Sequence, residues 1–122
     1  FLSGKDEVSW VKHPSLKSHK GYKVACKLMP KGSGAIISFG LKGGKKRAVK
    51  FIESLKIFSH LANIGDAKSL IIHPASTTHS QLSKSELTKV GITEDLIRIS
   101  VGIEDLDDLL KDINSALLKS FK

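Results

Sequence analysis

The sequence has few of the residues that build covalent cross-links, metal clusters or membrane spans. Cys26 is its one cysteine, which excludes an internal disulfide and a cysteine-based zinc cluster and fits a reducing compartment. No apolar run approaches the roughly 18 residues of a membrane span, and no signal-peptide pattern is present. We therefore expect a cytoplasmic protein with no membrane partner. Because the first residue is Phe1 and not methionine, we also expect the chain to be a piece of a longer protein.

Aromatic residues are also scarce, at 6%, and acidic residues are outnumbered by basic ones. The formal net charge of +8 favours a nucleic-acid partner in principle, because lysine and arginine release counterions when they neutralise phosphates. However, 18 of the 20 basic residues are lysines, scattered from Lys5 to Lys122 without interleaved aromatic residues. Such a distribution is typical of a solvated surface. A small basic module that binds nucleic acid or another protein is the alternative function.

The rest of the composition, 40% apolar and 26% charged, is that of one globular domain. Short apolar runs bounded by glycine or proline predict four strands, at residues 8–11, 34–41, 69–73 and 96–103. Apolar residues at helical spacing and capping residues predict four helices, at residues 18–28, 44–58, 83–90 and 104–119. This alternation predicts an α/β (α+β) two-layer sandwich, with helices packed on a sheet of about four strands.

Two local motifs resemble catalytic sites without matching them. The glycine-rich segment 40–46 is similar to a phosphate-binding loop but lacks the required spacing and the Ser or Thr after the lysine. We interpret it as a strand-to-helix turn. His73 and His79 are six residues apart, a spacing that does not align them on one helix face, and no convincing carboxylate joins them. We predict a structural turn there and not a metal or hydrolytic site.

Arg98 is the one charged residue within the β-branched run 96–101. A buried charge is costly without a partner, so this arginine is expected to have an anionic one. Its planar guanidinium can bind a carboxylate ligand through two hydrogen bonds, or it can form a structural ion pair with a nearby acidic residue. The residues alone leave both interpretations open. The acidic cluster that follows is expected to be structural, since carboxylates stabilise the start of a helix: Asp105, Asp107 and Asp108.

Several motifs occur in an order that is similar to one enzyme family. Trp10 to His19 reads WVKHPSLKSH, Asn63 to Asp66 reads NIGD, His73 to His79 reads HPASTTH, and Arg98 to Glu104 reads RISVGIE. This order resembles the carboxy-terminal domain of the pyridoxal-phosphate (PLP) enzymes of cysteine and methionine metabolism. The resemblance implies that residues 1–122 form the small domain of a fold-type I PLP enzyme. It also implies a mostly antiparallel sheet and a large PLP-binding domain outside this sequence.

Within that family, the O-acetylhomoserine sulfhydrylases are the most similar group. The resemblance implies conversion of O-acetyl-L-homoserine and sulfide to L-homocysteine and acetate, with Arg98 and Asn63 binding the substrate α-carboxylate. It implies a homotetrameric parent enzyme whose PLP-binding lysine lies outside this chain, so the isolated chain is expected to be inactive. Three lysines could be tested for a Schiff base with PLP, but they lack the family's Ser-X-Thr-Lys context: Lys42, Lys45 and Lys46.

Two alternatives accompany this resemblance. Cystathionine γ-synthases, cystathionine lyases and methionine γ-lyases share the domain and are the other candidate activities. For Asn63, whose amide can donate two hydrogen bonds to a carboxylate, the alternative is a residue that only satisfies its own turn.

Overall fold

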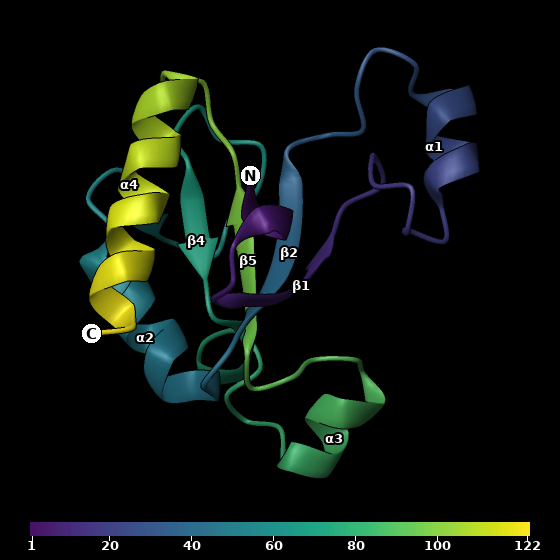
Figure 1. The fold of residues 1–122 in the computed structure, drawn as a ribbon. Coiled ribbons are helices and arrows are strands. Elements are labelled where there is room, and N and C mark those ends of the chain that lie inside the picture. Colours follow the sequence, from purple (N-terminus) through teal and green to yellow (C-terminus); the bar gives the residue numbers. More distant parts are fainter.

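The computed structural model describes residues 1–122 as a five-stranded sheet with helices around it (Figure 1). The strands lie in the order β1-β2-β5-β4-β3 and are β1 (Val8–Lys12), β2 (Ile36–Leu41), β3 (Ser59–His60), β4 (Leu70–Ile72) and β5 (Leu96–Ser100). The helices are α1 (Tyr22–Leu28), α2 (Gly44–Ser54), α3 (Lys84–Lys89) and α4 (Leu106–Ser120), with short 3-10 turns η1 (Leu2–Gly4) and η2 (Pro74–Ser76). None of the helices has the length and apolarity needed to cross a membrane.

Neighbouring strands are antiparallel, except that β3 and β4 are parallel. The predicted mixed α/β fold with a mostly antiparallel sheet is therefore confirmed, but the prediction of about four strands missed one. The missed strand, β3, has only two residues, Ser59 and His60, at the edge of the sheet. Two residues are too few to show the alternation from which strands are predicted.

The hydrophobic core lies between one face of the sheet and two helices, which gives the predicted two layers. Figure 1 shows α2 and α4 together on this side of the sheet, with α1 and α3 at the periphery. Phe39 of β2 meets Phe51 of α2 edge to face, with ring centroids 6.0 Å apart. Ile97 and Ile99 of β5 are buried in the same cluster.

Two helices differ from their predicted bounds by four residues at one end, and the other two by no more than two residues. The sequence predicts a first helix from Ser18, but turns occupy the residues before Gly21, and α1 begins only at Tyr22. His19 contributes to this delay, because its Nδ1 accepts the backbone N–H of Gly21 at 3.0 Å. The second predicted helix extends to Phe58, but α2 ends at Ser54. The third helix has the capping box predicted for it, and segment 40–46 forms the predicted strand-to-helix turn between β2 and α2.

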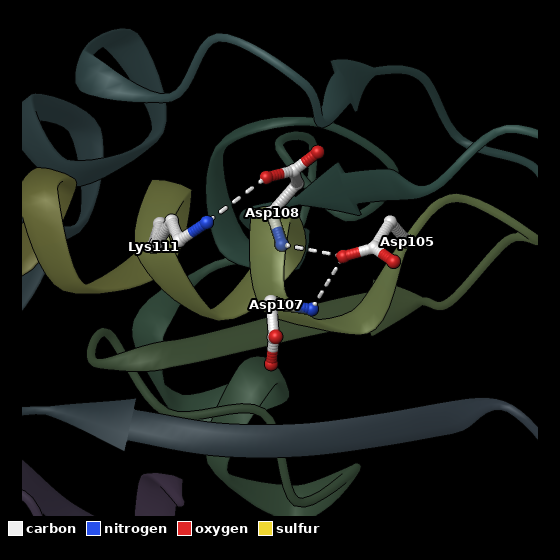
Figure 2. Close-up of polar contacts among 4 residues, drawn as sticks. All are labelled: Asp105, Asp107, Asp108 and Lys111. Carbon is white, nitrogen blue, oxygen red and sulfur yellow. Dashed lines mark hydrogen bonds and ion pairs between the residues drawn. The ribbon is translucent and has the colours of Figure 1, made fainter.

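The acidic cluster begins α4, as predicted (Figure 2). Asp105 caps the helix, because its Oδ1 accepts the backbone N–H groups of Asp107 at 2.9 Å and Asp108 at 3.2 Å. Asp108 also lies 3.4 Å from the Nζ of Lys111, one turn along the helix. Asp107 and Asp108 occupy the first turn, where negative charge stabilises the helix dipole.

The end of α2 is set by Asp112, which lies farther along α4. Its carboxylate accepts the backbone N–H groups of Lys56 at 3.0 and 3.1 Å and of Ile57 at 2.9 Å. The carboxylate thereby takes up N–H groups that a longer α2 would use in its own ladder. The chain leaves the helix at Leu55, which is extended with φ −71° and ψ 149°. Because this contact comes from another helix, the local apolar periodicity predicted an α2 that is too long.

The segment between β3 and β4 packs against the residues that follow β5. The Ile103 N–H donates to the Ala67 carbonyl oxygen at 2.9 Å. Gly102 makes this close approach possible, because a Cβ added there would overlap the backbone at Ala67 and Lys68. Backbone atoms cannot rotate away as a flexible side chain can, so relief requires the whole segment to move.

We predict that Asp112→Ala lowers the free energy of unfolding by about 1.5–3 kcal/mol, because it removes the carboxylate that accepts two partly buried backbone N–H groups. The matched control is Lys111→Ala in the same helix, which removes an exposed ion pair worth about 0–1 kcal/mol. Urea denaturation of both variants measures the difference. Equal losses would show that Asp112 does not anchor the end of α2.

A second stability prediction concerns Gly102→Ala, which should destabilise the fold by about 1–3 kcal/mol because the new methyl group overpacks a backbone contact. Gly4→Ala is the control, since a Cβ at Gly4 meets nothing within 4 Å. We expect Gly4→Ala to change the unfolding free energy by no more than about 0.5 kcal/mol. A Gly102→Ala variant as stable as Gly4→Ala would contradict the assigned close approach.

Candidate functional site

Arg98 lies at the centre of the sheet, on the face opposite α2 and α4. Its position follows from the alternation of side chains along β5: Ile97 and Ile99 are buried in the helix-covered core, so Arg98 points to the other face. Arg98 is paired with Ser38 on β2 and with Ile72 on β4. Arg98 is half-buried as a residue, and β5 has a strand on both sides.

The guanidinium of Arg98 has no carboxylate partner within the chain. The ion pairs of the structure join Lys84 to Glu94 and Lys111 to Asp108. The one hydrogen bond of the Arg98 side chain runs from Nη2 to the backbone carbonyl oxygen of Asn63, at 3.4 Å. The structural ion pair, which was the alternative interpretation of Arg98, does not form. A guanidinium has five N–H donors, so most of its donors remain available to a ligand.

The structure brings Asn63 to Arg98, across 35 residues of sequence. The contact uses the backbone of Asn63 and not its amide. The side-chain Oδ1 of Asn63 accepts the backbone N–H of Ile64 at 2.9 Å, as expected of an asparagine in a tight turn. The Nδ2 group makes no hydrogen bond within the chain. Asn63 is exposed, so these two donors are open to solvent.

Sequence reasoning missed the residues that hold the Asn63 segment in place. Ser100 Oγ accepts the backbone N–H of Gly65 at 3.2 Å. Glu104 accepts from Ser69 twice, from its backbone N–H at 2.7 Å and from its hydroxyl at 2.8 Å. The hydrogen bond from the Ser69 backbone, the largest effect, holds the pKa of Glu104 below its usual value. No local pattern in the sequence indicates these contacts, because each partner lies 35 residues away.

The two histidines considered as metal or hydrolytic residues have structural contacts. His73 is buried, with Nε2 at 2.8 Å from the Glu94 carbonyl oxygen and Nδ1 at 2.8 Å from the Ser76 hydroxyl. Because a carbonyl only accepts, Nε2 donates there. His79 Nδ1 lies 2.8 Å from the Thr78 hydroxyl. No group of three His, Cys, Asp or Glu side chains is arranged to hold a metal ion.

The lysines near the start of α2 also lack a catalytic environment. Lys42, Lys45 and Lys46 are exposed. An amine that binds a cofactor covalently is commonly activated by desolvation, which an exposed lysine lacks. The chain thus contains a guanidinium without a carboxylate partner, at Arg98, and these three lysines are not enclosed.

Comparison with known proteins agrees with the resemblance of the motifs. The family model for Cys/Met metabolism PLP-dependent enzymes matches residues 1–118. Homocysteine synthase of Schizosaccharomyces pombe is 48% identical over 117 residues, and O-acetyl-L-homoserine sulfhydrylase of Leptospira meyeri is 50% identical over 118 residues. Each alignment covers 96% of this chain. The crystal structure of cystathionine γ-lyase from yeast superposes on the whole chain with a TM-score of 0.94 and 41% identity.

The chain spans 27% of the length of the two curated relatives and 32% of the yeast lyase. The lysine that carries PLP in this family lies outside the 122 residues. The match of the family model over nearly the whole sequence, the identities near one half and the shared fold all lead to the same assignment. The chain belongs to the family of Cys/Met metabolism PLP-dependent enzymes.

Proposed function

We propose that residues 1–122 are the carboxy-terminal, substrate-carboxylate-binding domain of a PLP-dependent O-acetylhomoserine sulfhydrylase. The observation that carries this proposal is the guanidinium of Arg98, which lies on the sheet face opposite the helices without a carboxylate partner and beside Asn63. A planar donor fork in that position matches an α-carboxylate through two parallel hydrogen bonds. The reaction would convert O-acetyl-L-homoserine and sulfide to L-homocysteine and acetate.

The names of the relatives favour the sulfhydrylase reaction over its alternatives. Relatives named homocysteine synthase or O-acetyl-L-homoserine sulfhydrylase are 44–50% identical to this chain. Structures of a cystathionine γ-synthase and a cystathionine γ-lyase, at 37% and 41% identity, share the fold and keep those activities as the second candidates. Family membership favours an enzyme domain over the alternative of a small basic binding module.

In this proposal the chain's own residues bind and orient the substrate. Arg98 holds the α-carboxylate, and the carbonyl of Asn63 keeps the guanidinium in place. The Nδ2 of Asn63 donates a further hydrogen bond to the same carboxylate. PLP, bound by the large domain of the enzyme, supplies an electron sink for the bond-breaking steps. The isolated chain is accordingly inactive, and the homotetrameric state implied by the resemblance stays a prediction.

We predict that Arg98→Lys lowers activity toward O-acetyl-L-homoserine in the full-length enzyme, because lysine keeps the charge but loses the planar fork. Arg98→Ala should weaken binding by an amount on the order of 2–5 kcal/mol. The measurement is the affinity for an amino acid compared with that for its descarboxy amine. The wild type should prefer the carboxylate-bearing ligand, and Arg98→Ala should lose most of that preference.

Lys12→Ala is the control for Arg98. Lys12 pairs with Ser38, which pairs with Arg98, so the two cations lie in one cross-strand row on the same face of the sheet. If general positive charge on this surface bound the ligand, both variants would lose the preference together. A preference that survives in Arg98→Ala would place the carboxylate elsewhere and refute the site assignment.

Asn63→Ala tests the second residue of the site. If the Nδ2 of Asn63 donates to the carboxylate, the variant should weaken substrate binding by roughly 1.5–3 kcal/mol, as for a hydrogen bond to a charged group. Isothermal titration with an unreactive amino acid measures this change, and thermal unfolding reports the stability of the same samples. Unchanged affinity with lowered stability would limit Asn63 to its turn.

A further inference from the structure

We propose that Glu104 is a positioning residue for the carboxylate site. Acting through Ser69, Glu104 fixes the segment 63–69 against β5 and thereby sets where the Asn63 carbonyl meets Arg98. The inference rests on the proposed function, because the property to be positioned is recognition of a carboxylate by Arg98. Glu104 itself does not touch the ligand in this scheme.

A constant offset along the sequence is the first observation behind this proposal. Arg98 bonds to Asn63, Ser100 bonds to Gly65 and Glu104 bonds to Ser69, and each pair is separated by 35 residues. In each pair a side chain of the RISVGIE motif bonds to a backbone group of segment 63–69. Segment 63–69 therefore runs beside β5 and its continuation in one fixed register, as a strand would, although it is not a strand.

The contacts also form a gradient of strength. The two bonds at Glu104 are 2.7 and 2.8 Å long, the bond at Ser100 is 3.2 Å, and the bond at Arg98 is 3.4 Å. Hydrogen bonds to an ionised acceptor are the stronger kind, and a bond of 3.4 Å is at the long end of the range. Segment 63–69 is thus anchored at its Glu104 end and weakly held at its Asn63 end, where the ligand is proposed to bind.

Ser69 explains why the anchor must be a carboxylate. Ser69 is fully buried, and its hydroxyl donates to Glu104 while accepting the backbone N–H of Gly102 at 2.8 Å. Its backbone N–H needs a second acceptor, which is the other oxygen of Glu104. A glutamine at this position would have one acceptor oxygen and one donor group, so one of the two Ser69 donors would lose its partner.

The test compares Glu104→Gln with wild type in the full-length holoenzyme. We expect Glu104→Gln to raise the KM for the amino-acid substrate about tenfold, the equivalent of about 1.4 kcal/mol, and to reduce the preference for an amino acid over its descarboxy amine. The kcat and the PLP content should change much less. Glu94→Gln is the control, because Glu94 is an exposed carboxylate paired with Lys84 on the surface. Glu94→Gln should leave the preference unchanged.

The double variant Arg98→Ala/Glu104→Gln separates this proposal from the proposed function. If Glu104 acts through Arg98, its substitution should have no further effect on the preference once Arg98 is gone. If Arg98→Ala alone keeps the preference, the proposed function fails. If Arg98→Ala loses the preference while Glu104→Gln keeps it, the positioning role is overturned and the proposed function stands.

Ser100→Ala is a second variant that tests the same register if Glu104→Gln folds poorly. This substitution is nearly isosteric and removes only the acceptor of the Gly65 N–H. We expect a smaller loss of the preference in the same direction, about two- to fivefold, as for one neutral hydrogen bond. An unchanged preference in Ser100→Ala would contradict the idea that the register of segment 63–69 controls the site.

Discussion

Ile97 and Ile99 are buried beneath α2 and α4, and their burial fixes which face of the sheet every residue of β5 occupies. Each of the two side chains contributes on the order of 1.5–3 kcal/mol on burial. A shift of β5 by one residue would exchange them for Arg98 and Ser100 and would place an unpaired guanidinium in the core, where a charge is costly. The orientation of Arg98 is therefore a consequence of core packing. The isoleucines on one face of β5 determine that Arg98 points outward from the other face.

Carboxylates support much of the remaining structure, while most of the lysines have no ionic partner. Asp105 begins α4, Asp112 ends α2 and Glu104 holds segment 63–69, each by accepting from backbone N–H groups. Among the lysines, only Lys84 and Lys111 form ion pairs. The net charge of +8 is the excess of 20 basic residues over 12 acidic ones, and most of the lysines lie at the surface without an ionic partner. That distribution is the one expected of a solvated surface.

Sequence reasoning succeeded where the relevant physics is local. The capping box of α3, the turn at 40–46 and the apolar run of β5 are all defined by residues that lie within a few positions of one another. Sequence reasoning failed where a distant residue determines the local structure, as at the end of α2, where Asp112 accepts the backbone N–H groups of the residues that follow the helix. Arg98 could be found as a single charge in an apolar run. The function of Glu104 could not, because its partner Ser69 is 35 residues away in a segment without periodicity.

The proposed site recognises a group that many amino-acid substrates share. The α-carboxylate is the same whether a sulfhydrylase, a synthase or a lyase acts on the substrate, so a domain that binds it has no reason to change its backbone between these reactions. The similarity of the fold to both a cystathionine γ-synthase and a cystathionine γ-lyase is what such a shared site leads one to expect. On this view the RISVGIE motif serves the common part of recognition, with Arg98 as the donor and the residues after it as its support. The chemistry that distinguishes one reaction from another then depends on groups that contact the substrate beyond its carboxylate.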